Sequence, residues 1–256
     1  MPPSRPWKSG AAGPSGGLPH SSRYGAPLYQ AFLTALGYGL CHQLPERSFF
    51  GGGFQVPVCA RDTGIYVGFV VSVLVLQVLG RSRRSEPPAW PVILLAGAFV
   101  VAMGLDGINS NTGLVNAMWT TTNDTRLATG LLTGGAISLL ATPIVNGQLW
   151  RDPSPDRVLS GAREVVVWLS SLAAAFAVVR LVFPLTAAGF PAIVAACIVV
   201  TFWWVNLAIV CLVPAFERRA VRLREAWAAH LLAVGLTLLE LGAGSAFRLL
   251  VLRLLS

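Results

Sequence analysis

Long apolar spans separated by short polar segments dominate this chain. Six of them approach the roughly 20 residues that a helix needs to cross a hydrocarbon core; they cover residues 64–80, 89–105, 127–150, 165–188, 191–214 and 226–247. A shorter apolar run at 26–40 fits a tilted first crossing or a half-helix that dips in and returns, and we favour the crossing. The pattern predicts an all-α, polytopic integral membrane bundle of about seven spans, or of six if 26–40 does not cross.

Composition supports the same class. The chain is 54% hydrophobic and 12% charged, with a mean hydropathy of +0.65, which lies outside the usual range of soluble domains. Its formal net charge is +8. The basic residues fall in short clusters between apolar runs, where they act as topology signals, so we expect the lipid bilayer and no nucleic acid as a partner.

Basic loops predict the orientation. They follow the first, third and fifth long spans and contain Arg81, Arg83, Arg84, Arg151, Arg157, Arg163, Arg218, Arg219, Arg222 and Arg224. Since such loops stay in the cytoplasm, segments 41–63 and 106–126 both face outward. Residues 1–25, rich in Pro, Gly and Ser, read as a disordered basic tail. A cytoplasmic tail agrees with a crossing at 26–40, and we expect the plasma membrane of a prokaryote.

Four metal-ligand side chains precede the first long span: Cys41, His42, Cys59 and Asp62. Two thiolates, an imidazole and a carboxylate form a plausible tetrahedral zinc set. The alternative is a Cys41–Cys59 disulfide, because an outward-facing loop lies in an oxidising compartment. The residues alone leave both alternatives open.

Other polar residues on the same predicted side offer a second candidate site. Arg47, Arg61 and Arg126 are suited to bidentate phosphate binding, and Asp106 and Asn123 complete the candidate substrate-binding set. Simple pairing with carboxylates and lipid headgroups is the alternative that we favour. Asp106 lies deep in its span and therefore needs a partner or a proton.

Two further charges lie within the last three spans. Arg180 and Glu240 have matching predicted depths, which favours an intramembrane ion pair over a proton or ion relay. His230, Cys197 and Cys211 are expected to be packing residues. Small residues one helical turn apart, at Gly64 and Gly68 and at Gly130 and Gly134, predict that the two helices carrying them are neighbours.

The motifs resemble those of a family of small membrane proteins known as domain of unknown function 2085. Its C-H-Q-x-P-x-R-S-F block is similar to 41–49, its C-A-R-C-T-G-I-Y-x-G block to 59–68, and its N-x-x-R-x-x-T-G block to 123–130. An aspartate corresponding to Asp106 ends the intervening span. This chain departs from the pattern at Asp62, where the family has a second cysteine. The resemblance covers about residues 29–150, implies a site but no reaction, and divides the chain into a motif-bearing domain, 26–150, and a three-helix extension, 151–256.

Three functional hypotheses follow from these residues. The first is metal-dependent chemistry on a lipid-linked or phosphorylated substrate at the outer leaflet. The second is a transporter or permease that uses Asp106, Arg180 and Glu240. The third is a non-catalytic assembly subunit locked by a Cys41–Cys59 disulfide. No nucleophile or general base can be assigned, and Glu46 and Asp62 are only candidates.

Overall fold

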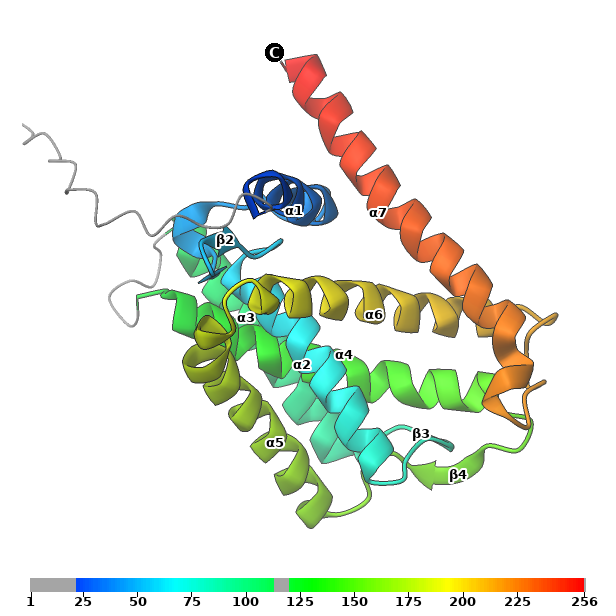
Figure 1. Cartoon of the computed structure of the whole chain (residues 1–256). Helices are drawn as coiled ribbons and strands as arrows, with labels where there is room; N and C mark the ends of the chain where they lie inside the picture. Colours follow the sequence, from blue (N-terminus) through cyan, green and yellow to red (C-terminus); the bar gives the residue numbers. More distant parts are fainter. Residues whose placement is uncertain (1–21, 113–119, 256) are drawn as a thin grey trace, which may run out of the picture.

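The computed structural model describes residues 22–112 and 120–255, most of them helical (Figure 1). The main helices are α1 (Ser22–Gly37), α2 (Ala60–Val78), α3 (Trp90–Thr112), α4 (Asn123–Leu149), α5 (Ala162–Ala177), α6 (Gly189–Cys211) and α7 (Trp227–Leu255). Within the described ranges, α2 to α7, with short extensions to α5 and α7, are long and apolar enough to cross a membrane. The all-α membrane fold is thus confirmed, with six candidate spans.

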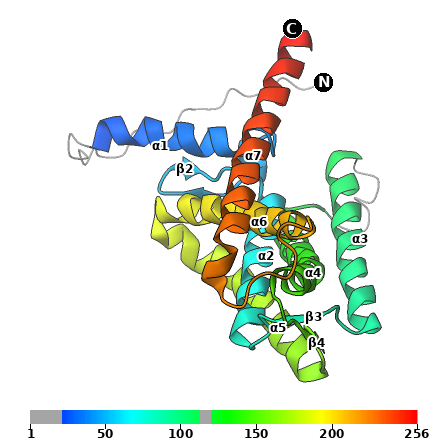
Figure 2. The ribbon, with the colours of Figure 1, turned by 90° about the vertical axis from the view of Figure 1, so that its right-hand side faces the viewer.

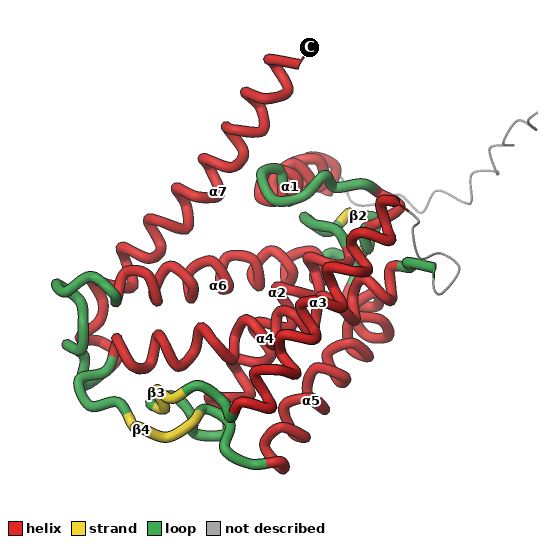
Figure 3. Tube along the Cα trace, turned by 180° about the vertical axis from the view of Figure 1, so that it is seen from behind, coloured by secondary structure: helices red, strands yellow, loops and turns green. Residues whose placement is uncertain are grey.

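Short strands mark the two ends of the bundle. The hairpin of β1 (Phe50–Gly51) and β2 (Phe54–Gln55) lies beside α1, whereas β3 (Arg84–Glu86) and β4 (Ser154–Arg157) pair in parallel at the opposite end (Figure 3). We call these the motif end and the basic end, because the second carries the arginine-rich loops. Segments 41–59 and 120–126 both lie at the motif end, as the sequence predicted.

Helix α1 differs from the favoured expectation. Its 16 residues extend about 24 Å at ~1.5 Å per residue, short of the ~30 Å hydrocarbon core. It lies crosswise to α2 and α7 (Figure 2). Two polar contacts fasten it to the motif end: the Tyr29 hydroxyl donates to the Ala188 carbonyl at 2.6 Å, and Gln30 accepts from the Gln55 amide at 3.0 Å. The six-span alternative therefore describes the structure, and the seventh crossing does not.

The predicted tail and the second polar segment are only partly described. Residues 1–21 lie outside the described part of the chain, and positions 22–25 begin α1. Residues 113–119 of the segment 106–126 are likewise outside it. The expected cytoplasmic N-terminus depended on a crossing at 26–40, so it loses that support. The division of the chain near residue 150 stays a prediction.

Helices α2 and α4 pack closely against each other and are neighbours, as their glycines predicted. A Cβ atom added to Gly64 would meet the Leu127 carbonyl oxygen at 2.5 Å, and one added to Gly130 would overlap the Arg61 carbonyl oxygen. Gly68 and Gly134 contact the partner backbone in the same way. The predicted neighbourhood of these helices is confirmed, and it brings Arg61 and Asp62 on α2 beside Arg126 on α4.

Replacement of Gly130 by alanine is expected to destabilise the fold by about 1–3 kcal/mol, because the added methyl group forces the two backbones apart. Gly104 on α3 is the matched control, since a Cβ there meets nothing within 4 Å. Alanine at that position is expected to be neutral or to stabilise by up to about 1 kcal/mol. Thermal unfolding of both variants in detergent makes the comparison; an equal stability of the two would contradict the close-packing account.

Helices α3, α5 and α6 pack on this pair, and α7 packs on α6. Helices α5 and α6 both contact α2 and α4, and α3 lies along α4 (Figure 1). Trp168 of α5 is fully buried and donates its indole N–H to the Ser72 hydroxyl of α2 at 2.7 Å. This hydrogen bond satisfies a polar group that lipid could not. The C-terminal segment, residues 151–255, therefore contributes directly to the core around α2.

Candidate functional site

The loop before α2 folds back on itself around two glutamines. Gln43 has a left-handed backbone, with φ of 56°. Its side-chain amide donates to the carbonyl oxygens of Thr34 at 2.9 Å and Pro57 at 2.8 Å. Gln55 in turn donates to the Gln43 carbonyl at 2.8 Å. These bonds hold an otherwise unfavourable backbone and bring the beginning of the loop against its end.

Gln43→Ala is expected to lower stability by about 1–3 kcal/mol, because the Thr34 and Pro57 carbonyls lose their donor while the left-handed backbone remains. The matched control is Gln77→Ala, at the basic end of α2. Melting temperatures in detergent report the difference. A Gln43→Ala variant as stable as Gln77→Ala would show that the loop is held by other contacts.

Helix α7 supplies a second clamp that the sequence did not predict. Arg248 donates to the carbonyl oxygens of Tyr38 at 2.6 Å and Cys41 at 2.7 Å, and its guanidinium lies over the Tyr38 ring at 4.4 Å. Both acceptors are backbone atoms, so no residue pattern marks the contact. The only sequence signal is an arginine among the apolar residues of the last span. The extension thus positions Cys41.

The folded loop places two thiols beside a carboxylate. Cys59 precedes α2 and Asp62 lies in its first turn, so the two side chains share one face of the helix. The Cys59 thiol donates to Asp62 Oδ2 at 3.3 Å, and the Cys59 amide donates to Cys41 Sγ at 3.3 Å. One potential ligand atom from each of Cys41, Cys59 and Asp62 lies within 4.8 Å of the others. This group could hold a metal ion.

The two thiols differ in acidity. A hydrogen bond from Cys59 lowers the pKa of Cys41 to about 7, against the opposing effect of burial. The same bond, together with burial, raises the pKa of Cys59 above its ordinary value. Thiolate is the form that binds metal, so Cys41 is the thiol closer to that form. Both cysteines are free in this structure.

His42 does not join this group. It is exposed and lines the same cavity, but only Cys41, Cys59 and Asp62 form the ligand cluster in the described part of the chain. Cys41 and His42 are adjacent in the chain, whereas zinc ligands are usually spaced at least two residues apart. The structure therefore brings three of the four predicted ligands together.

A cavity of about 450 Å³ connects these ligands with the predicted arginines. Its lining comes from the loop, α2, the end of α3 and the start of α4, which places segments far apart in the sequence at one site. The lining residues are Leu40, Cys41, His42, Gln43, Leu44, Arg47, Cys59, Arg61, Asp62, Asn111 and Arg126. Seven of the nine residues predicted for metal or substrate binding are among them. The other two, Asp106 and Asn123, contact the lining residues Arg61 and Arg126.

Each arginine is held by a different partner. Arg61 forms an ion pair with the buried Asp106 at 2.5 Å. Arg47 donates to the Asn111 side-chain oxygen at 3.1 Å. Because Arg47 bonds a neutral group, its charge is not neutralised by that contact.

Arg126 is held by neutral groups as well. It is 8% exposed and donates to the Asn123 side-chain oxygen at 2.9 Å and the Ser110 hydroxyl at 2.8 Å. Its Nε, like that of Arg61, has no hydrogen-bond partner within the described residues. A buried cation with only neutral partners favours an anionic ligand in the cavity.

The predicted Arg180–Glu240 pair is not formed. Arg180 pairs with Asp124 at 2.5 Å, and Glu240 accepts from the Asn206 amide at 2.8 Å. The physical reason is the length of the span, which ends at Val182 and not at 188, so that Arg180 lies near its motif end, beside Asp124 in the first turn of α4. Depth counted from sequence had placed it deeper.

Together, the six candidate spans and this cavity define a polytopic helical membrane protein with a cysteine, carboxylate and arginine site at one end. The chain matches the family described as Predicted membrane protein (DUF2085) over residues 41–140, the stretch that carries the site. It belongs to this family, as its motifs predicted.

Two archaeal relatives extend this comparison. An uncharacterized protein of Methanocaldococcus jannaschii is 31% identical over 106 residues, which are 41% of this chain and 63% of the relative. An uncharacterized protein of Methanothermobacter thermautotrophicus is 31% identical over 101 residues, 40% of this chain and 83% of the relative. This chain therefore spans just under two thirds of the length of the first relative. No solved structure matches this chain.

Proposed function

We propose that the motif-end cavity binds zinc through Cys41, Cys59 and Asp62 and acts on a phosphorylated or lipid-linked substrate. The observation that carries the proposal is the shared cavity, in which three ligand atoms within 4.8 Å of one another face Arg47 and Arg126. Three protein ligands leave a coordination position open, which is typical of catalytic rather than structural zinc. When bound, zinc supplies a Lewis acid and an acidified water.

The arginines have the second role in this proposal. Arg47 and Arg126 hold their charges with neutral side-chain partners, so they can bind phosphate oxygens without first breaking an ion pair. Arg61 already pairs with Asp106, and we assign it to positioning the first turn of α2. The bilayer supplies substrate laterally, since the cavity lies at the end of membrane-spanning helices.

We place the cavity on the outer face of a prokaryotic cytoplasmic membrane. The support is the arginine-rich basic end, which the positive-inside rule keeps in the cytoplasm. With six spans, the motif end, α1 and the end of α7 then lie outside. This orientation replaces the cytoplasmic N-terminus expected from a seventh crossing.

The test combines binding and turnover in vesicles of phosphatidylcholine. Zinc-loaded protein is expected to bind inorganic pyrophosphate and to release phosphate from an isoprenyl pyrophosphate. Arg126→Gln is expected to weaken pyrophosphate binding about tenfold or more, the loss expected for a charge-assisted contact. Arg157→Gln in β4 is the matched control, at the other end of the molecule. Unchanged binding in Arg126→Gln, or phosphate release that survives removal of zinc, would reject the proposal.

A second candidate is an assembly subunit whose motif-end loop is locked by a Cys41–Cys59 disulfide. The observation that favours it is the proximity of the two sulfur atoms, which lie within 4.8 Å of each other. Thiol labelling of purified protein separates the candidates: labelling of this pair only after reduction supports the disulfide, whereas protection by zinc alone supports the metal. The transporter hypothesis gains no support, because Asp106, Arg180 and Glu240 have three separate partners.

A further inference from the structure

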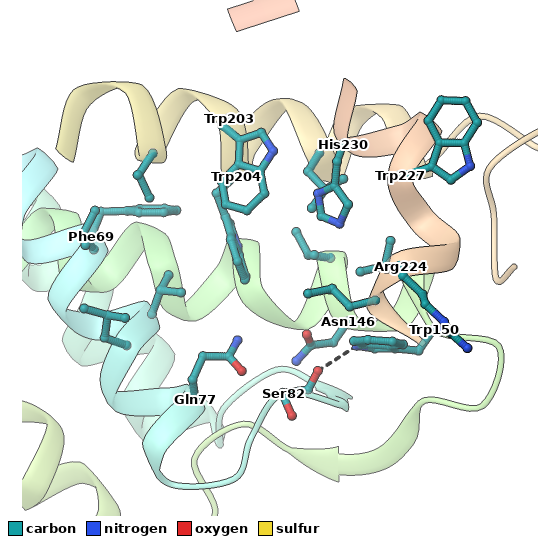
Figure 4. A pocket seen from close by; sticks show the side chains of 18 of the residues that line it. Phe69, Gln77, Ser82, Asn146, Trp150, Trp203, Trp204, Arg224, Trp227 and His230 are labelled. Atoms are coloured by element: carbon teal, nitrogen blue, oxygen red, sulfur yellow. Dashed lines mark hydrogen bonds between the residues drawn. The ribbon is translucent and has the colours of Figure 1, made fainter. Parts of the chain in front are cut away.

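A second cavity lies away from this site, toward the basic end. Its volume is about 990 Å³, at the upper limit of the ~300–1,000 Å³ typical of small-molecule sites. Helices α2, α4, α6 and α7 all contribute to its walls (Figure 4). Neither the family match nor the motif-end chemistry accounts for it.

The walls of this cavity are apolar and rich in tryptophan. Phe69 and Val73 line it from α2, Trp203 and Trp204 from α6, and Trp227 from α7 (Figure 4). Trp227 is 64% exposed and lies near the basic end of its span, as expected for a residue at the membrane–water interface. An apolar cavity whose lining includes an interfacial tryptophan is suited to a hydrocarbon chain.

Some of the polar side chains that line this cavity already have hydrogen-bond partners in the protein. Asn146 donates to the carbonyl oxygens of Arg81 at 2.9 Å and Arg84 at 2.8 Å, and Trp150 donates to the Ser82 carbonyl at 2.8 Å. These contacts tie the loop after α2 to α4. They leave Asn146 and Trp150 with a structural role at the rim.

His230 and Trp204 have unused hydrogen-bonding groups. Both ring nitrogens of His230 and the indole nitrogen of Trp204 are buried without a hydrogen-bond partner within the described residues. His230 projects into the cavity beside Trp203, with ring centroids 5.4 Å apart (Figure 4). Its expected role as a packing residue therefore leaves two buried nitrogens unexplained. A ligand with hydrogen-bond acceptors inside the cavity would satisfy the N–H groups.

Arg224 also lines the cavity and contributes a positive charge. It is exposed and forms no ion pair in the described part of the chain. The neighbouring carboxylate of Glu225 accepts from the backbone amides of Val221 at 2.9 Å and Arg222 at 3.3 Å, and is thus engaged locally. Arg83 lies over the Trp150 ring at 4.4 Å, which adds a second cation nearby.

We infer that this cavity is a binding site for one anionic glycerophospholipid of the leaflet at the basic end. Its phosphate lies at Arg224, its glycerol oxygens accept from His230 and Trp204, and one hydrocarbon chain fills the tryptophan-lined space. Along the cavity, Arg224 lies at one end, His230 and Trp204 follow, and Phe69 lies at the far end (Figure 4), which matches the order of charge, acceptors and chain along such a lipid. The inference is independent of the proposed zinc chemistry, because no lining residue is shared between the two cavities.

Native mass spectrometry of the full chain tests this inference. Protein is reconstituted with equal amounts of phosphatidylglycerol and phosphatidylcholine and then extracted in detergent. Wild type is expected to retain one phosphatidylglycerol in preference to phosphatidylcholine. Arg224→Gln is expected to weaken that retention about fivefold, the factor typical of one basic residue at an anionic surface.

Adjacent valines on α6 provide a matched pair of variants for the chain site. Val200 lines the cavity and Val199 does not, and their exposed fractions are 37% and 40%. Val200→Phe is expected to lose most of the retained lipid, and Val199→Phe to keep it. Equal retention by the two variants would assign the lipid to the outer surface of the bundle and overturn the inference, as would wild type that retains no lipid or shows no preference for the anionic one.

Discussion

Wild type is expected to bind about one zinc ion per chain, and replacement of Cys59 by serine is expected to abolish that binding. The Cys59 thiol lies between its partners: it contacts Asp62 at 3.3 Å, and its backbone amide contacts Cys41 Sγ at 3.3 Å. A serine hydroxyl is a poor zinc ligand, and two remaining protein ligands do not hold the metal tightly. Elemental analysis of protein purified from zinc-containing medium and washed with a weak chelator measures the loss.

Cys197→Ala is the matched control for this prediction. Cys197 is buried in α6 among apolar residues, away from the cluster. It is expected to keep the full zinc content. Zinc lost equally from both variants would point to general damage, and zinc retained by Cys59→Ser would exclude Cys59 as a ligand.

Asp106→Ala is expected to destabilise the protein by about 3–5 kcal/mol, because it leaves the Arg61 guanidinium in a largely buried position without its ion-pair partner. The side chain of Asp106 is 3% exposed and that of Arg61 is 18% exposed. The double variant that combines Asp106→Leu with Arg61→Met is expected to recover most of the stability, since removal of both charges leaves none unpaired.

The Arg84–Asp156 ion pair is the control, because it shows how much an exposed ion pair contributes to stability. Asp156 is 63% exposed and lies 4.0 Å from Arg84. Asp156→Ala is expected to change stability by about 0–1 kcal/mol. Reversible unfolding in mixed detergent micelles compares the two single variants. A loss at Asp106 no larger than that at Asp156 would mean that the buried pair does not hold α2 and α3 together.

The assembly of the motif-end site could be predicted from the sequence because it depends on simple geometry. Successive helices cross the membrane in opposite directions, so Asp106 and Arg126 lie at the same end of the bundle as Cys59, which precedes α2. Helical spacing places Asp62 on the same side as Cys59. The paired glycines at 64, 68, 130 and 134 predicted that α2 and α4 are neighbours. These regularities are local or follow from counting the spans, so they can be predicted from the sequence alone.

Other features depended on tertiary contacts that leave no pattern. The positive φ of Gln43 and the Arg248 clamp both involve backbone acceptors, which every residue provides. Arg180 was placed at depth in a span predicted to end at 188, but the span ends at Val182 and Arg180 pairs with Asp124 near that end. The short α1 was apolar enough to suggest a crossing, whereas its polar contacts with Ala188 and Gln55 hold it crosswise.

Cys41, Cys59 and Asp62 are expected to form one metal centre with an open position. The decisive measurement is X-ray absorption at the zinc edge of the zinc-loaded protein. Two sulfur ligands at about 2.3 Å and oxygen ligands at about 2.0–2.2 Å are expected. A spectrum with no zinc–sulfur contribution, or with four sulfur ligands, would contradict it.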